Sequence, residues 1–152
     1  MTTSAKAMER PVIGKAISQV AMAMEALPIL DSEELTEVTL EKILSSTSEA
    51  DMFPNPSSLS LDDLSGQTII VRGVLGAMRS TKKDSAYPLF LAVDCQDPKT
   101  GEQMTLLTGS KFACASLMKA HSAGRFPIEV EVVVKPNASD PTTSSHWLVA
   151  HR

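Results

Sequence analysis

The sequence predicts a mainly β protein with an α-helical N-terminal arm, and three observations support this fold class. Apolar residues recur at spacings of three and four in residues 11–44, which is typical of helices. Five later segments are rich in β-branched or alternating apolar residues, as strands are. Ser, Pro and Asn are concentrated in residues 45–60, which indicates a linker. The predicted domains are therefore an acidic helical arm with its linker, residues 1–60, and a β domain, residues 61–152.

The arm is predicted to contain two helices. The first covers residues 11–27 and ends at Pro28, because proline cannot continue a helix. Asp31 or Ser32 can cap a second helix that runs to about Leu44. Two short helices are marginal on their own. We therefore expect them to dock on the β domain or on a second subunit. In the second case the chain would form a homo-oligomer through these helices.

The β domain is predicted as strand, strand, strand, helix, strand, strand. Gly73 and Gly76 lie inside the first strand and indicate bulges or bends, which help a strand to curl around a barrel. Five strands with one helix between the third and fourth is the topology of an OB-type barrel. The predicted strands and helix are, in order, Thr68–Met78, Tyr87–Cys95, Gln103–Thr108, the helix Lys111–Ser122, Ile128–Lys135 and His146–His151.

Charge is distributed unevenly along the chain. Residues 1–66 carry four basic and eleven acidic groups, whereas residues 67–152 carry ten basic and seven acidic groups. The net charges of these parts are −7 and +3, and the whole chain carries −4. A mildly basic β domain is a weak indication of a polyanionic partner, and two ordinary solvated surfaces explain it equally well.

The β domain resembles the OB-fold single-stranded-DNA-binding proteins of bacteriophages and related mobile elements. The resemblance covers roughly the last ninety residues and implies a role in DNA replication or recombination. It rests on four segments, which are DLSGQTIIVRGV (Asp63–Val74), YPLFLAVDC (Tyr87–Cys95), TLLTGSKFACASLMKA (Thr105–Ala120) and FPIEVEV (Phe126–Val132).

Single strands bind OB barrels across the second and third strands, through cations for the phosphates and flat rings for the bases. The loop after the first predicted strand offers three cations in five residues, and Phe90 is predicted to point outward from the second strand. Tyr87 lies on the core face of that strand, yet its place beside the loop could let it reach a base. The predicted nucleic-acid-binding residues are Arg79, Lys82, Lys83, Tyr87, Phe90, Lys111, Lys135 and Trp147.

Signs of an enzyme are poor. The three histidines have no partner at metal-ligand spacing, and no glycine-rich phosphate loop opens a helix. Cys95 and Cys114 have neither metal spacing nor the density of a disulfide scaffold, so we interpret both as free thiols in a reducing compartment. We therefore expect no catalytic site, no metal and no cofactor.

The leading functional prediction is sequence-tolerant binding of single-stranded DNA, with RNA left open, by a cytoplasmic protein. Polar residues interrupt the most apolar N-terminal stretch, so no membrane association is expected. The alternative is a non-enzymatic protein-interaction module, such as an adaptor or structural subunit, on the same barrel. The aromatic content of 4% and the acidic total favour this alternative.

Overall fold

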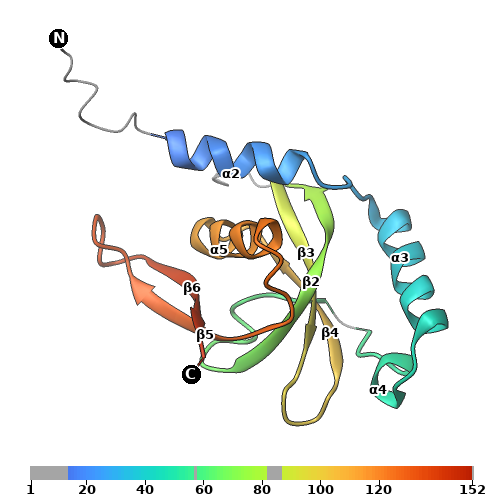
Figure 1. Cartoon of the computed structure of the whole chain (residues 1–152). Coiled ribbons are helices and arrows are strands. Elements are labelled where there is room, and N and C mark those ends of the chain that lie inside the picture. Colours follow the sequence, from blue (N-terminus) through green and yellow to red (C-terminus); the bar gives the residue numbers. More distant parts are fainter. Residues whose placement is uncertain (1–13, 57, 82–86, 152) are drawn as a thin grey trace.

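A six-stranded sheet that curls into a half-barrel dominates the computed structural model of the chain (Figure 1). The structure describes residues 14–56, 58–81 and 87–151. Within these residues the strand order is β1-β4-β3-β2-β5-β6, and every pair is antiparallel except β1 with β4. The mainly β fold class with an α-helical N-terminal arm is confirmed at this level. The sheet has one strand more than the five that were predicted.

The predicted strands and the predicted helix of the β domain are all present. The structure adds two short elements, α4 and β1, inside the segment that we interpreted as a linker. Its elements are α2 (Lys15–Glu25), α3 (Ser32–Ser45), α4 (Glu49–Met52), β1 (Ser58–Leu59), β2 (Thr68–Arg79), β3 (Leu89–Gln96), β4 (Gln103–Thr108), α5 (Lys111–Ser122), β5 (Ile128–Pro136) and β6 (Ser144–Ala150).

Strand β2 bends twice, and both bends adjoin the glycines that the sequence singled out. The register of β2 against β3 shifts between Val71 and Gly73 and again between Val74 and Gly76. Each shift inserts an extra residue into β2, which increases the local twist of the strand. The predicted bulges are confirmed, and they let β2 pair with β3 along its length while its first residues pair with β5.

Gly76 also lets the arm cross β2 at close range. A Cβ atom on this residue would lie 2.7 Å from the carbonyl oxygen of Pro28. The crossing chain is held by two backbone hydrogen bonds, from Ala77 N to Pro28 O at 2.9 Å and from Leu30 N to Ala77 O at 2.7 Å. The connection between α2 and α3 is therefore fixed to the barrel by backbone contacts that only a residue without a side chain permits.

The core lies between the sheet and two helices. Leu91, Val93 and Cys95 of β3 are fully buried, as the alternation of that strand predicted. Met24 of α2 is equally buried and belongs to the same core. Helices α2 and α5 contact each other and both contact the sheet, so α2 is part of the barrel's packing although it belongs to the predicted arm (Figure 1).

Helices α3 and α4 are attached differently. Neither helix contains a buried residue, and both stand beside the barrel rather than over its core (Figure 1). Asp31 caps α3 through a reciprocal pair of hydrogen bonds with Glu34, so the predicted cap is confirmed. We call α3 and α4 together the lobe. No described helix has the length and apolar character that crossing a membrane requires.

Candidate nucleic-acid interface

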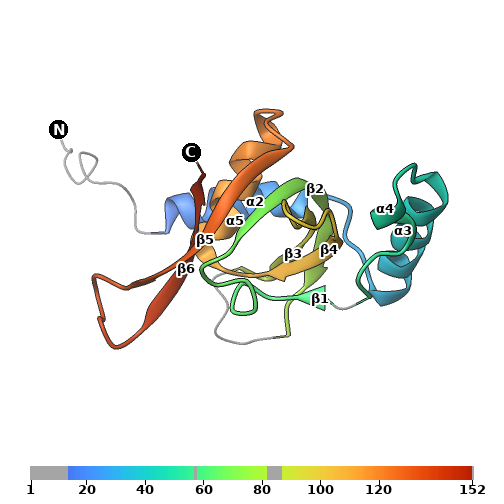
Figure 2. The same cartoon turned by 90° about the horizontal axis from the view of Figure 1, so that it is seen from below.

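A hollow of about 540 Å³ opens on the outer side of β3 and β4. It lies where the end of β2, the start of β6 and the loop after β1 come together, and Figure 2 shows β1 running beside β4 at this side of the sheet. The described residues that line it are Ser60, Leu61, Asp62, Ser80, Thr81, Phe90, Leu107, Thr108, Gly109, Ser110 and His146.

Phe90 is the aromatic residue of this hollow. It is half-buried, and it lies on the face of β3 opposite to the fully buried Leu91 and Val93, as predicted. Gly109 lies beside it, and a Cβ atom there would sit 3.5 Å from the Phe90 Cβ. The absence of a side chain at Gly109 therefore leaves more of the ring uncovered. A partly exposed ring can stack on a base.

Tyr87 does not belong to the interface. Its exposure is 3%, and its hydroxyl donates a hydrogen bond of 3.0 Å to the carbonyl oxygen of Lys111. Burial, with a smaller contribution from Cys114, raises the pKa of the phenol. The ring is enclosed in the core and offers no face to a base, so including it among the binding residues was wrong.

Trp147 lies on a second aromatic surface, outside the hollow. Its ring stacks on Phe112 with centroids 3.8 Å apart and an interplanar angle of 12°. Lys111 Nζ lies 5.1 Å from the centroid of the Phe112 ring. Because His146 lines the hollow and side chains alternate along a strand, Trp147 points to the opposite face of β6.

None of the predicted cations that the structure describes lines the hollow. Arg79 is exposed at the end of β2, and Lys111 and Lys135 are exposed on α5 and β5. None of the described residues lining the hollow is Lys or Arg. Lys82 and Lys83 lie outside the described residues.

His146 connects β6 to the loop after β1. Its Nε2 atom lies 2.8 Å from Asp62 Oδ1, and the Ser110 hydroxyl donates a hydrogen bond of 3.0 Å to the His146 carbonyl oxygen. The Nε2 atom is buried and has no well-aligned hydrogen-bond partner among the described residues. Sequence reasoning did not identify Asp62, because nothing local to it signals a partner on the last strand.

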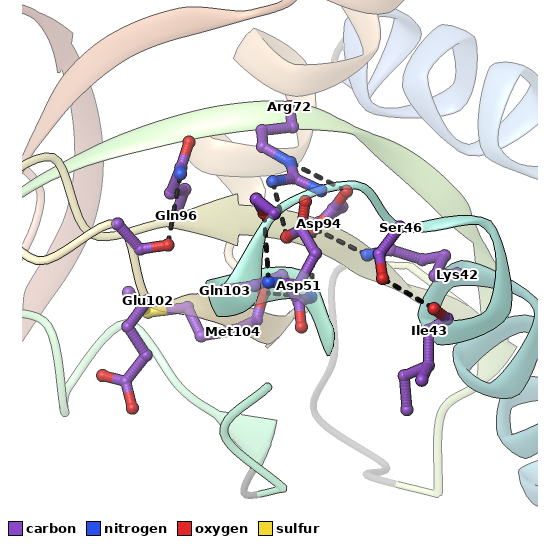
Figure 3. Close-up of polar contacts among 12 residues, drawn as sticks. Lys42, Ile43, Ser46, Asp51, Arg72, Asp94, Gln96, Glu102, Gln103 and Met104 are labelled. Atoms are coloured by element: carbon purple, nitrogen blue, oxygen red, sulfur yellow. Dashed lines mark hydrogen bonds and ion pairs between the residues drawn. The ribbon is translucent and has the colours of Figure 1, made fainter. Parts of the chain in front are cut away.

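A polar network covers the same face of the sheet farther along β3 and β4 (Figure 3). Asp94 is at its centre. Its Oδ1 lies 2.7 Å from Lys42 Nζ and accepts a hydrogen bond of 3.1 Å from Gln103, while its Oδ2 accepts one of 3.2 Å from Arg72 Nε. A second hydrogen bond, of 2.9 Å, runs from Arg72 to Asp51 of the lobe. The lobe is therefore joined to the sheet by two ionic contacts.

The carboxylates of this network stabilise the charged form of Arg72. Burial by itself would lower the pKa of Arg72, but Asp94 and Asp51 outweigh it and the pKa is raised. Asp94 contacts two cations of the protein itself, Lys42 and Arg72. No group of three His, Cys, Asp or Glu in the described residues could hold a metal ion.

The two thiols are buried in the core. Burial raises the pKa of Cys95 and that of Cys114 to about 12, and Asp94 contributes further at Cys95. Both groups are therefore thiols at neutral pH and neither is an activated nucleophile.

Comparison of the chain with protein-family models, with curated proteins and with solved structures finds no match.

Proposed function

We propose that the chain is a single-stranded-DNA-binding module built on an OB-type barrel. The observation that carries the proposal is the hollow on the outer side of β3 and β4, with the half-exposed ring of Phe90 in it. In an OB-type barrel these two strands correspond to the second and third strands, which form the binding face.

The connectivity of the sheet supports the same assignment. Strands β2, β3 and β4 form a meander, α5 follows, and β5 returns to pair with β2 before β6 pairs with β5. An OB-type barrel has this order, with its helix between the third and fourth strands. The short strand β1 lies at the free edge of β4, so the proposal includes an additional strand at the position where such a barrel closes.

Binding would be tolerant of sequence. A ring that stacks on a base does not read its hydrogen-bonding edge, and a hydroxyl group such as that of Thr81 can donate a hydrogen bond to any phosphate regardless of sequence. Arg79, with Lys82 and Lys83 of the following loop, would supply the phosphate contacts. The resemblance to proteins of phages and mobile elements extends the proposal to replication or recombination of such DNA in the cytoplasm.

The test is fluorescence anisotropy of a labelled oligo-dT titrated with the full chain at low and moderate salt, beside a duplex of matched length. We expect binding to the single strand that weakens steeply as salt rises, because phosphate contacts release counterions. Phe90→Ala should weaken binding by about 1–3 kcal/mol, the usual contribution of one stacked ring. Phe53→Ala is the matched control, because Phe53 is an exposed ring on the lobe, 78% accessible.

A second candidate is a protein-interaction module, and one observation favours it. The described lining of the hollow carries the carboxylate of Asp62 and no Lys or Arg, which suits a protein ligand better than a polyanion. Absence of binding to oligo-dT at low salt would reject the DNA proposal in favour of this one. Unchanged affinity in Phe90→Ala would remove the hollow from the binding site.

A further inference from the structure

The lobe exposes apolar side chains that nothing in the described structure covers. Leu44 is 85% and Phe53 78% accessible, and Leu40 and Met52 are also exposed. Leu40 and Leu44 lie one turn apart on α3, so they share a face. Beside Leu44 a hollow of about 440 Å³ opens between α3 and Leu75 of β2. We call Leu40, Leu44, Met52 and Phe53 the lobe patch.

Negative charge surrounds the lobe patch. Across residues 31–53 the chain has seven carboxylates and one cation, Lys42. Lys42 is already paired with Asp94, and Asp51 is paired with Arg72. The carboxylates that remain exposed on the two helices are Glu33, Glu34, Glu37, Glu41 and Glu49. A surface that covers the lobe patch must therefore be apolar at its centre and basic at its rim.

The hairpin of β5 and β6 exposes a second apolar surface. Trp147 and Val149 are 36% and 45% accessible, and they share one face of β6 because they are two residues apart. Phe112 stacks on Trp147 and extends this surface toward α5. β6 is an edge strand of the sheet. We call Phe112, Trp147 and Val149 the hairpin patch.

Two cations border the hairpin patch, because Lys111 Nζ lies 5.1 Å from the centroid of the Phe112 ring and Lys135 pairs with Ser145, two residues before Trp147. In residues 111–151 the exposed charged side chains of Lys, Arg, Asp and Glu are four cations and one carboxylate. The other two carboxylates there, Glu129 and Glu131, are half-buried, and Glu129 lies 3.4 Å from His151. Glu131 pairs with Val149, so it is the one carboxylate on the face of the hairpin patch itself. The exposed groups are Lys111, Lys119, Arg125 and Lys135, with Asp140 as the single carboxylate.

The two patches lie at opposite ends of the molecule. Figures 1 and 2, at right angles to each other, both show α3 and α4 on one side of the barrel and the β5–β6 hairpin on the other. The lobe patch therefore cannot reach the hairpin patch of its own chain, although the two are complementary in charge and alike in apolar character. It can reach the hairpin patch of another copy.

We propose that this chain associates head to tail, with the lobe patch of one copy docked on the hairpin patch of the next. Such a contact joins two different surfaces, so each added copy leaves one free patch at either end and the assembly can grow into a ring or a filament. Burial of apolar side chains provides the attraction, and the opposite charges at the rims select the orientation. The proposal does not depend on nucleic-acid binding.

The test is sedimentation velocity of the full chain over a wide concentration range, at low and high salt, without nucleic acid. We expect masses above that of the monomer that rise with concentration and fall as salt screens the rims. A lobe variant, Leu44→Asp with Phe53→Ser, and a hairpin variant, Trp147→Ser with Val149→Asp, should each stay monomeric. Met22→Ser, which removes an apolar side chain 68% accessible on α2, should associate like the original chain.

Mixing the two variants gives the sharpest result. Each retains the patch that the other lacks, so an equimolar mixture should form a complex of two chains and stop there. Lys111→Glu with Lys135→Glu provides a second hairpin variant that leaves the apolar residues intact, and it should also reduce association. A monomer at every concentration, or variants that associate like the original chain, would overturn the proposal. Loss of oligo-dT binding with unchanged association in the hairpin variant would instead assign that patch to nucleic acid.

Discussion

The barrel and the lobe are parts of one chain that are held in place by different physical means. In the barrel, Leu91 and Leu106 are fully buried among aliphatic neighbours from every central strand. The lobe contains no buried residue in either helix, and it is held to the sheet by the contacts of Lys42 and Arg72 with Asp94 and Asp51. Salt does not screen the burial of apolar side chains, whereas it weakens partly exposed ion pairs.

The barrel therefore specifies the fold, and the lobe is available for other contacts. Neither helix of the lobe contributes a buried residue to the core, so we expect its detachment to cost less than unfolding of the barrel. Regions of low local stability are the ones that proteins use for binding and regulation. The proposed docking of the lobe on a second copy uses the part of the chain that can move without disturbing the core.

The largest expected effect comes from a cavity in the barrel. Leu91→Ala removes a fully buried side chain, and we expect a loss of about 2–5 kcal/mol in the free energy of unfolding. The same substitution at Leu44, which is 85% accessible on the lobe, should change it by less than about 0.5 kcal/mol. Urea denaturation followed by far-UV circular dichroism measures both. Equal losses at the two positions would contradict the division between barrel and lobe.

A smaller effect is expected where the arm crosses the barrel. A methyl group at Gly76 would lie 2.7 Å from the Pro28 carbonyl oxygen and 2.9 Å from the Leu30 side chain, so the crossing segment must move. We expect Gly76→Ala to lower the free energy of unfolding by about 1–3 kcal/mol, as overpacking does.

Gly73 is the matched control for this crossing. It lies in the same strand, and a Cβ atom there would meet nothing within 4 Å. Gly73→Ala should leave stability unchanged or raise it by up to about 1 kcal/mol, since alanine has fewer unfolded conformations to lose. Equal stability of Gly76→Ala and Gly73→Ala would show that the close approach of the arm does not depend on a glycine at position 76.

Local signals predicted most of the barrel. Strand alternation identified the strands, Gly73 and Gly76 marked the bulges, and the Asp31 cap fixed the start of α3. The two short elements were missed for a physical reason. β1 has two residues, and its pairing with β4 depends on a segment far along the chain rather than on its own sequence.

The candidate site was predicted less completely. Alternation placed Phe90 on the outer face correctly, and the same alternation placed Tyr87 on the core face, which its burial confirms. The error was to let the loop beside Tyr87 outweigh that signal. The contacts between His146 and Asp62 and between Lys42 and Asp94 join residues distant in sequence, so no spacing or periodicity could reveal them.

The smallest expected effect tests the attachment of the lobe. Lys42→Gln removes the cation 2.7 Å from Asp94 Oδ1 but leaves that carboxylate its hydrogen bonds from Arg72 and Gln103. We expect the local stability of the lobe to fall by up to about 1 kcal/mol, which is the usual contribution of a partly exposed ion pair. The stability of the barrel should not change. Amide hydrogen exchange should therefore accelerate in residues 32–52 and stay unchanged in the central strands.

Lys99→Gln is the control for the attachment, because it removes the same charge from the exposed turn between β3 and β4 and should leave exchange in the lobe unaltered. High salt should reproduce the effect of Lys42→Gln in the original chain and add little to it in the variant, because both act on the same ion pair. If exchange in the central strands accelerated as much as in the lobe, the lobe and the barrel would unfold as one cooperative unit. Attachment of the lobe to the sheet would then be a condition of folding of the barrel.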